Sequence, residues 1–209
     1  MIPSVLYVIL TCEKYKHRQK LQLDTWIKYI GGNDNYLYLS DIDGMDIKYE
    51  NVAIKYINFI KSCTECLKFD WVFFCDDDTF VFPKKLGWLL KFYDKNMPLI
   101  IGRKGIYNGW ELCSGGAGFA VSKQLFLSVK RYLAFEDNNI LPNSDTSFGM
   151  WAKKADDRML VIDNPNQFQT QHPRHPDNEY MDVDSIISMH YCDEQDFKLL
   201  SKYLKYNIN

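Results

Sequence analysis

The sequence contains no apolar run long enough to cross a membrane and no signal peptide. A membrane-spanning helix needs about 18 or more consecutive apolar residues, and no such run occurs in the 209 residues. The first residues, Met1 to Tyr7, lack the basic start and the small-residue cleavage site of a signal peptide. We therefore predict no membrane segment in this chain, and we expect either a cytoplasmic protein or a domain of a longer one.

The sequence also lacks an excess of charge of either sign. Lys and Arg number 25 against 27 Asp and Glu, so the formal net charge is −2. Nucleic-acid binding requires a basic surface that neutralises phosphates, and we therefore predict no nucleic-acid partner. The phosphate-binding motif G-x-x-x-x-G-K-[ST] is absent too, which argues against a Mg²⁺-dependent phosphoryl-transfer enzyme of the P-loop type.

Cysteine is present, but in no clear metal or redox motif. Of the 6 cysteines, Cys63 and Cys66 form a lone C-x-x-C pair, and no second pair follows at the spacing of a zinc site. Other cysteines lie in predicted strands, where a free cysteine is commonly buried. We therefore interpret Cys63 and Cys66 as packing residues.

Apolar residues are abundant and arranged in alternating strand-like and helix-like segments. Hydrophobic residues make up 46% of the chain and aromatic residues 15%, which is typical of a wide, sheet-based core. The predicted strands are 4–10, 36–39, 71–75, 99–102, 159–162 and 186–191. The predicted helices are 16–30, 51–69, 122–132, 194–203 and one each from Pro83 and Pro142, with a turn at 41–44 and a loop at 164–184. This alternation predicts an α/β fold in one domain, residues 1–209.

The most informative segment is the apolar run Trp71 to Cys75, which leads directly into Asp76, Asp77 and Asp78. Three adjacent carboxylates repel one another unless a cation neutralises them. Their oxygens suit Mg²⁺ or Mn²⁺, and open α/β sheets bind ligands at the carboxyl ends of their strands. The sequence therefore favours a metal site, with a solvated acidic turn as the alternative.

Two further segments indicate a bound ligand. Basic residues gather in the first turns of the helix predicted from Lys16, where they are unfavourable for the helix dipole and suggest an anion to be held. The segment Ser114 to Gly118 contains three glycines and an alanine, so that another group can approach its backbone closely.

These segments, in this order and spacing, resemble the Fringe-like β1,3-glycosyltransferases of glycosyltransferase family 31. The similarity runs from Thr11 to His190. It rests on Arg18 with Leu21 to Trp26, Phe73 to Val81, Gly102-Arg103, Ser114 to Phe119, Asp145 with Gly149, and Ser188 to Tyr191.

The resemblance implies a GT-A fold with a mixed central sheet flanked by helices, a UDP-sugar donor, a glycan or glycoprotein acceptor, and Mn²⁺, with Mg²⁺ as an alternative. The nucleotide-binding part would span about residues 1–102 and the acceptor part about 103–209. Asp78 would ligate the ion, and Asp76 or Asp77 would reach the ribose or the donor sugar. The positions that the resemblance assigns to the donor are Thr11, Arg18, Lys55, Asp76, Asp77, Gly115 and Gly116.

Asp145 occupies the family's position for the general base that deprotonates the acceptor hydroxyl during inversion. A helix cap is the alternative role, and the family's second adjacent acid is replaced here by Ser144. A retaining enzyme on the same fold, or a non-catalytic sugar-binding domain, would not need this base. Trp110 would stack on an acceptor sugar or, equally, pack in the core.

The late histidines offer a third metal ligand. His190 matches the family's late histidine, and a neutral imidazole favours Mn²⁺ over Mg²⁺. His172 competes for this role, and His175 is a weaker candidate. We predict Asp78 and His190 or His172 as the metal ligands.

Overall fold

The computed structural model describes residues 1–40, 52–135, 139–175 and 182–206. Its main sheet has the strand order β2-β1-β3-β8-β5-β9. These strands are β1 (Val5–Leu10), β2 (Asn35–Leu39), β3 (Trp71–Asp76), β5 (Leu99–Gly102), β8 (Phe119–Ser122) and β9 (Leu160–Asp163). Strand β8 runs antiparallel to both of its neighbours, whereas the other pairs are parallel. The sheet is therefore mixed, and it contains strands from both parts of the chain that the sequence distinguishes.

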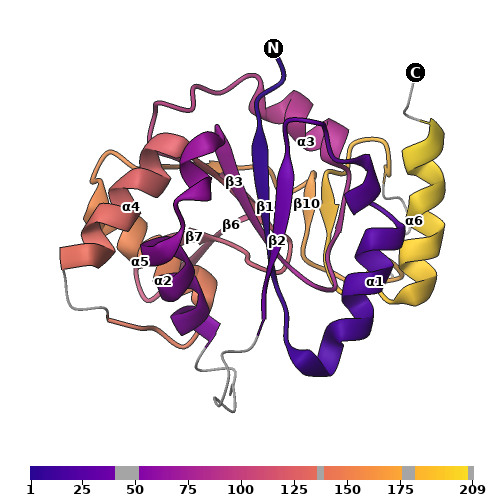
Figure 1. Ribbon diagram of the computed structural model, residues 1–209, viewed down its shortest axis with the longest axis horizontal. Helices are drawn as coiled ribbons and strands as arrows, with labels where there is room; N and C mark the ends of the chain where they lie inside the picture. The colour runs from indigo at the N-terminus through magenta and orange to yellow at the C-terminus, as the bar shows by residue number, and fades with distance from the viewer. Residues whose placement is uncertain (41–51, 136–138, 176–181, 207–209) are drawn as a thin grey trace.

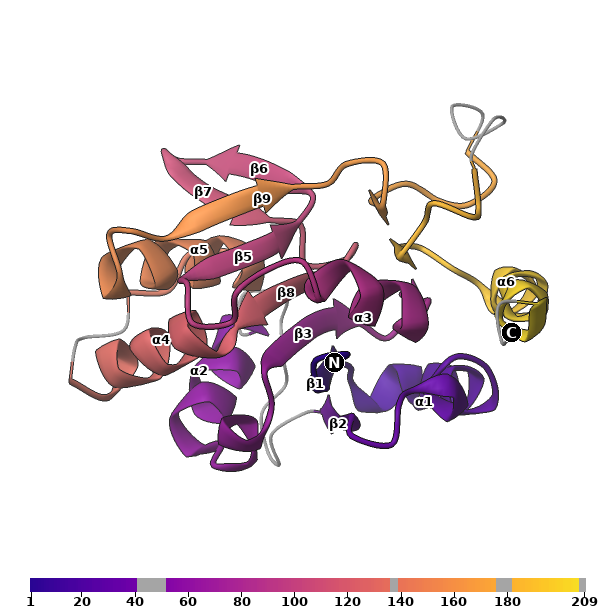
Figure 2. The same cartoon turned by 90° about the horizontal axis from the view of Figure 1, so that it is seen from above.

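Helices cover both faces of this sheet (Figures 1 and 2). The α-helices are α1 (Lys16–Asp24), α2 (Val52–Ser62), α3 (Pro83–Leu90), α4 (Lys123–Phe135), α5 (Ser144–Ala155) and α6 (Glu194–Tyr206), and the short 3₁₀ helices include η1 (Glu13–Tyr15), η2 (Ile27–Tyr29) and η4 (Glu65–Lys68). Helices α2, α4 and α5 lie on one face, and α1, α3 and α6 lie on the other. The predicted α/β fold with a mixed sheet between helices is confirmed.

The main sheet separates two hydrophobic cores. Val5, Tyr7 and Ile9 of β1 belong to the core beneath α1, α3 and α6. Leu6 and Val8 belong to the core beneath α2, α4 and α5. Since successive side chains of a strand point to opposite faces, a strand buried on both faces must be apolar throughout. This explains why β1 and β3 are continuous apolar runs in the sequence.

Two smaller sheets extend the fold. Strands β10 (Phe168–Gln169), β11 (Ser188–Met189) and β4 (Phe80–Val81) form one of them, in the order β10-β11-β4. The predicted strand at 186–191 is thus only two residues long, and β10 lies inside a segment predicted as a loop. The other sheet is the hairpin of β6 (Lys104–Tyr107) and β7 (Trp110–Cys113), which the pattern analysis missed. Its signal was Asn108-Gly109, a favoured two-residue hairpin turn whose residues both have positive φ.

The helix predicted over 16–30 is shorter than expected. Helix α1 ends at Asp24, and Thr25 leaves the helical conformation with ψ of −97°. This change of direction turns Trp26 and Ile27 into the core, while Leu23 is 40% exposed. Tertiary burial of Trp26 therefore overrides the continuous helical pattern. The predicted turn at 41–44 lies outside the described residues.

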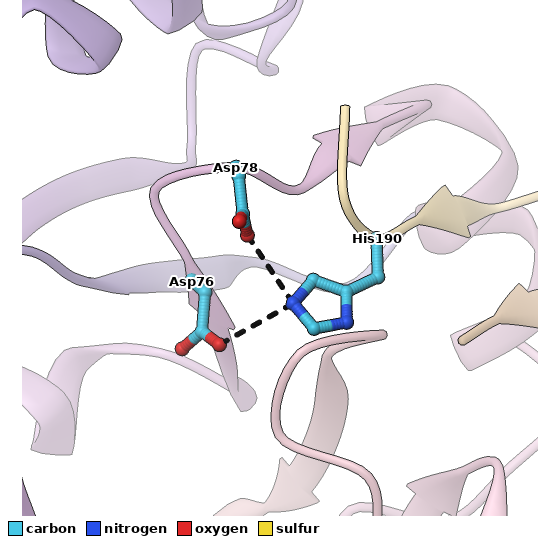
Figure 3. A group of neighbouring side chains, drawn as sticks. All are labelled: Asp76, Asp78 and His190. Atoms are coloured by element: carbon cyan, nitrogen blue, oxygen red, sulfur yellow. Dashed lines mark ion pairs between the residues drawn. The ribbon is translucent and has the colours of Figure 1, made fainter. Parts of the chain in front are cut away.

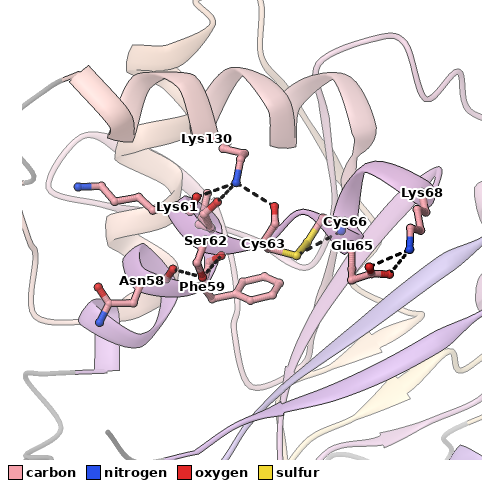
Figure 4. Close-up of a disulfide and its surroundings, with 10 residues drawn as sticks. Asn58, Phe59, Lys61, Ser62, Cys63, Glu65, Cys66, Lys68 and Lys130 are labelled. Atoms are coloured by element: carbon pink, nitrogen blue, oxygen red, sulfur yellow. Dashed lines mark hydrogen bonds and ion pairs between the residues drawn. A yellow bond between two sulfur atoms is a disulfide. The ribbon is translucent and has the colours of Figure 1, made fainter.

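The helix predicted over 51–69 divides into α2 and η4, and a disulfide lies at the division (Figure 4). Lys130 of α4 donates hydrogen bonds from Nζ to the carbonyl oxygens of Ile60, Lys61 and Cys63, at 3.0, 2.7 and 2.8 Å. These bonds satisfy carbonyls at the carboxyl end of α2 and thus end the helix. Cys63 and Cys66 are buried as expected, but they form a disulfide. Packing alone was therefore the wrong interpretation, because the chain turn after Ser62 brings the two sulfurs together.

No helix in the described segments is both long enough and apolar enough to cross a membrane.

Candidate active site

The acidic triplet forms a tight turn between β3 and β4. Thr79 closes it, since its backbone N donates to the carbonyl oxygen of Asp76 at 3.2 Å and its hydroxyl donates to the carbonyl of Gly116 at 2.6 Å. Gln22 of α1, which is fully buried, lies with its amide nitrogen 3.3 and 3.4 Å from the carbonyl oxygens of Asp76 and Thr79. The turn is therefore bound both to the glycine segment and to α1. Gln22 was not predicted from the sequence. Glutamine is mostly exposed in proteins, and no local pattern marks this one as buried.

Three side chains of types that can ligate a metal lie close together, namely Asp76, Asp78 and His190 (Figure 3). Their ligand atoms all lie within 4.8 Å of one another. His190 Nε2 is 3.2 Å from Asp78 Oδ1 and 3.7 Å from Asp76 Oδ2. Asp78 Oδ1 is buried and makes no hydrogen bond within the described residues, and its neighbour His190 Nε2 would be an ion-pair partner only if the imidazole were protonated. A buried carboxylate oxygen without a donor is costly, and two carboxylates with an imidazole form a donor set that suits Mn²⁺. These residues therefore fit a divalent cation.

Electrostatics at the triplet also favour a cation. Burial raises the pKa of Asp76 to about 7, and the negative charges of Asp78, Asp77 and Asp145 act in the same direction, whereas His190 opposes them. A carboxylate in such surroundings is destabilised by desolvation and by like charge. A bound cation would offset both contributions.

The segment after β11 delivers His190 to the triplet. The backbone N of His190 donates to the carbonyl of Gln169 at 3.0 Å, and that of Cys192 donates to the carbonyl of Asp78 at 2.9 Å. The imidazole lies directly over Gly116, where a Cβ atom would be only 2.0 Å from Cε1 of the ring. The imidazole also stacks on the ring of Tyr191, with 3.7 Å between the two ring centroids. The imidazole is thus held on several sides.

Asp77 points to a different set of partners. Its Oδ2 accepts a hydrogen bond from the hydroxyl of Thr11 at 2.8 Å, and its Oδ1 accepts one from Arg18 Nη1 at 2.8 Å. Burial raises the pKa of Asp77, although the bonds from Arg18 and Thr11 oppose the rise. Arg18 also lies 3.3 Å from Asp78 Oδ2 and packs over the ring of Tyr15. Arg18 therefore joins Asp77 to the metal-ligating group.

Lys55 contributes to this arrangement through the backbone of Thr11. It belongs to α2, its side chain is buried, and its Nζ donates to the carbonyl oxygen of Thr11 at 2.6 Å. The bond fixes the end of β1, where Thr11 faces Asp77. The structure thus places Lys55 against the backbone of Thr11, whose hydroxyl binds Asp77.

Asp145 lies against the glycine segment. The backbone N of Gly115 donates to Asp145 Oδ2 at 3.0 Å, and that of Thr146 donates to Oδ1 at 2.8 Å. Asp145 is the second residue of α5, after the cap residue Asn143, so it is not itself the helix cap. The hydroxyl of Thr146 also donates to Oδ1, at 3.4 Å. These donors orient the carboxylate, and Oδ2, which accepts one hydrogen bond, keeps a lone pair for a further proton or hydrogen bond.

Other predicted site residues lie elsewhere. His172 groups with Asp193 and Asp196, and its Nε2 is 3.5 Å from Asp196 Oδ2. His175 follows it in an exposed turn. Trp110 begins β7 at the turn end of the hairpin, about 13 Å along the strand from Ser114, and it packs partly against a core. The structure does not bring these three side chains to the triplet.

The mixed six-stranded sheet, with an acidic turn at the end of β3, is the GT-A type of glycosyltransferase fold. The sequence profile described as Fringe-like matches residues 2–158, and the chain belongs to the Fringe-like family.

Three solved structures share this fold. A glycosyltransferase involved in glycosylation of the major capsid of PBCV-1 superposes with a TM-score of 0.60 at 15% identity, over 98% of this chain and 100% of that one. The bifunctional enzyme WbbM gives 0.56 at 12% identity, over 99% of this chain and 52% of that one. GlyE of Streptococcus pneumoniae TIGR4 gives 0.55 at 10% identity, over 95% and 60%. At these identities the likeness shows the shared fold.

Proposed function

We propose that the protein transfers a sugar from a UDP-sugar to a hydroxyl group of a glycan or glycoprotein, with Mn²⁺ and with inversion at the anomeric carbon. The observation that carries the proposal is the group of Asp76, Asp78 and His190, in which a buried carboxylate oxygen of Asp78 makes no hydrogen bond within the described residues and faces the imidazole at 3.2 Å. Family membership supports sugar transfer as the reaction class.

Asp78 and His190 would hold the metal, with Asp76 as the third ligand in reach. When bound there, a divalent ion stabilises the negative charge that develops on the departing diphosphate. The imidazole favours Mn²⁺, and Mg²⁺ is the weaker alternative.

Arg18 is the residue that would bind the donor's phosphate or ribose oxygens next to this metal. Its guanidinium is 29% exposed and already spans Asp77 and Asp78. Thr11 and Asp77, whose side chains are bonded to each other, would orient the nucleotide at the end of β1. Lys55 would contribute indirectly, by holding the carbonyl of Thr11.

Asp145 would act as the general base. The backbone N–H groups of Gly115 and Thr146 hold its carboxylate, so that a free lone pair can take the proton of the acceptor hydroxyl as that oxygen attacks the sugar. The contribution of Asp145 to the electrostatics of Asp76 is consistent with its lying near the metal ligands. Gly115 and Gly116 would leave room for the donor and acceptor sugars.

The test is UDP release from a panel of UDP-sugars by the full chain, with Mn²⁺, with Mg²⁺ and with EDTA. We expect Mn²⁺-dependent turnover that Asp78→Asn reduces by about 100-fold or more, because the metal site loses a ligand. Asp157→Asn, at an exposed carboxylate remote from β3, is the matched control and should retain full activity.

Product analysis then separates the alternatives. Inversion predicts that NMR shows the opposite anomeric configuration and that Asp145→Asn loses about 100-fold or more in turnover. Retained configuration with an active Asp145→Asn variant would support a retaining transferase. Nucleotide-sugar binding without turnover would instead support a non-catalytic binding domain, and no binding in the presence of Mn²⁺ would exclude the proposal.

A further inference from the structure

A cavity of about 340 Å³ lies beside α3, and no residue of the acidic triplet lines it. Lys85, Trp88 and Phe92 line it from α3 and the residues just after this helix. Gln167, Asp184 and Ser185 line it from the segments before β10 and β11. The volume is within the range of cavities that bind small ligands.

Two aromatic side chains line this cavity and remain exposed to solvent. Trp88 is 54% exposed and Phe92 is 79% exposed. Trp88 belongs to α3 and Phe92 to the turn that follows it, and both face the same cavity. Neighbouring exposed aromatic rings are unfavourable in water and typically mark a binding surface.

The polar side chains of the cavity are available for a ligand. Neither the amide of Gln167 nor the carboxylate of Asp184 has a hydrogen-bond partner among the residues that the structure describes, nor has the indole N–H of Trp88. Lys85, by contrast, donates from Nζ to the carbonyl of Val183 at 2.8 Å and lies over the ring of Phe82. The cavity thus offers free donors and free acceptors beside aromatic rings, whereas Lys85 is already bound and Lys91 Nζ lies over the Trp88 ring, 5.0 Å from its centroid.

This combination matches the chemistry of a sugar. A pyranose ring has a C–H face that packs on an aromatic ring, and its hydroxyls both donate and accept hydrogen bonds. We propose that the cavity is a second carbohydrate site, which binds a neutral sugar unit of a glycan outside the catalytic site. A membrane surface is the less suitable partner, since the carboxylate of Asp184, which lines the cavity, would be repelled by anionic lipids.

The fold places this site at one end of the sheet β10-β11-β4, and the other end of that sheet adjoins the triplet and His190. The backbone N of Phe82 donates to the carbonyl of Ile187, which lines the cavity, at 2.8 Å. Strand β4 follows the triplet directly, and His190 comes three residues after Ile187, which is about 10 Å of extended chain. A glycan held here would therefore be anchored near the proposed catalytic site, but its binding requires neither the metal nor the nucleotide.

The experiment is a titration of the full chain, in EDTA and without nucleotide, with methyl glycosides of glucose, galactose, mannose and N-acetylglucosamine, and with lactose. Saturation-transfer NMR and calorimetry would detect the weak, millimolar binding that is usual for one sugar unit. We expect at least one sugar to bind, and Trp88→Ala to weaken its affinity by about tenfold through loss of stacking. Gln167→Ala should weaken it as well.

Phe135→Ala is the matched control, because Phe135 is an 84% exposed aromatic residue on α4. It should leave sugar binding unchanged. The proposal is overturned if no sugar binds, or if Trp88→Ala binds as well as the parent protein. It is overturned equally if Asp145→Asn removes binding, which would place the sugar at the catalytic site. Trp88-dependent self-association or Trp88-dependent binding to phosphatidylserine vesicles, each without sugar binding, would assign the surface to a second copy or to a membrane.

Discussion

At the scale of single residues, the glycines of the segment before β8 are explained by close neighbours within the protein. At Gly116 the neighbour is the imidazole of His190, and at Gly118, with φ of 81°, it is the ring of Phe73. At Gly115 a Cβ would be 3.4 Å from that of Asp145. The sequence indicates that something approaches this backbone. The structure shows that the proposed metal ligand and the proposed base are among the neighbours.

Gly116→Ala should therefore impair metal binding. The added Cβ would overlap the ring of His190, with atoms at 2.0 to 2.4 Å, so the imidazole must move away from Asp78. We expect Mn²⁺ affinity, measured by calorimetry, to fall by about 10-fold to 100-fold. Gly105→Ala is the control, since its Cβ would meet only Leu112, at 3.9 Å. Equal Mn²⁺ affinity in the two variants would contradict the placement of His190 as a ligand.

At the scale of elements, α6 begins with a reciprocal pair of caps that also fixes the segment carrying His190. Asp193 Oδ1 accepts from the backbone N of Gln195 and Asp196, and Asp196 Oδ2 accepts from the backbone N of Asp193. Arg174 pairs with both carboxylates. The group of His172, Asp193 and Asp196 thus has a structural role as a helix cap, which distinguishes it from the group at the triplet.

Asp193→Ala should destabilise the fold by about 1 kcal/mol, because the first turn of α6 loses its cap. Asp193→Asn retains an acceptor oxygen and should lose much less. Urea unfolding of the three proteins measures the difference. If the asparagine and alanine variants were equally unstable, the ion pair with Arg174 would be the dominant contribution instead.

Asp70 links the start of β1 to the start of β3 and makes stability depend on pH. Burial alone would raise its pKa, but hydrogen bonds from Lys95 and Ser4 outweigh burial, and the pKa lies below its ordinary value. Because the folded-state pKa is lowered, the stabilisation is present above the unfolded pKa of about 4 and is lost as the pH falls through the folded value.

Asp70→Asn should accordingly reduce the free energy of unfolding at pH 7 by about 1 kcal/mol, as expected for a partly exposed ion pair. The difference from the parent protein should shrink below pH 4, since Asp70 itself becomes protonated there. Urea titrations at several pH values, with Asp157→Asn as control, measure this. A difference that is constant from pH 3 to pH 7 would be inconsistent with the lowered pKa.

At the scale of the whole molecule, the candidate metal site joins distant parts of the chain. Asp76 and Asp78 follow β3 of the main sheet, whereas His190 follows β11 of the small sheet. A ligand that binds only the folded chain stabilises it in proportion to the logarithm of its concentration. A metal at this site would therefore stabilise the packing of the small sheet on the rest of the fold.

Mn²⁺ at about 100 times its Kd should stabilise the protein by about 2.7 kcal/mol, which corresponds to a rise in Tm of about 5 to 10 °C for a chain of this size. EDTA should reverse the rise, and Asp78→Asn should show none. Differential scanning calorimetry measures all three. An identical rise in the Asp78→Asn variant would locate metal binding elsewhere.

Much of the fold was predictable because strand and helix patterns depend on residues close together in sequence. Continuous apolar runs predicted β1, β3 and β5, and Pro83 marked the first residue of α3. The errors lie where a distant contact overrides the local pattern. Lys130 ends α2 by binding its carbonyls, and burial of Trp26 turns the chain after α1.

The sequence by itself determined that an acidic triplet follows a buried strand. Both features, the continuous apolar run and the three carboxylates after it, belong to one short segment. Only the tertiary structure decided which imidazole lies beside that triplet. The sequence offered both His190 and His172 as ligands, and the antiparallel pairing of β11 with β4 brings the first to Asp78 while the second lies against the cap of α6. Contacts between segments far apart in sequence depend on how the sheets pack, and no local pattern records that packing.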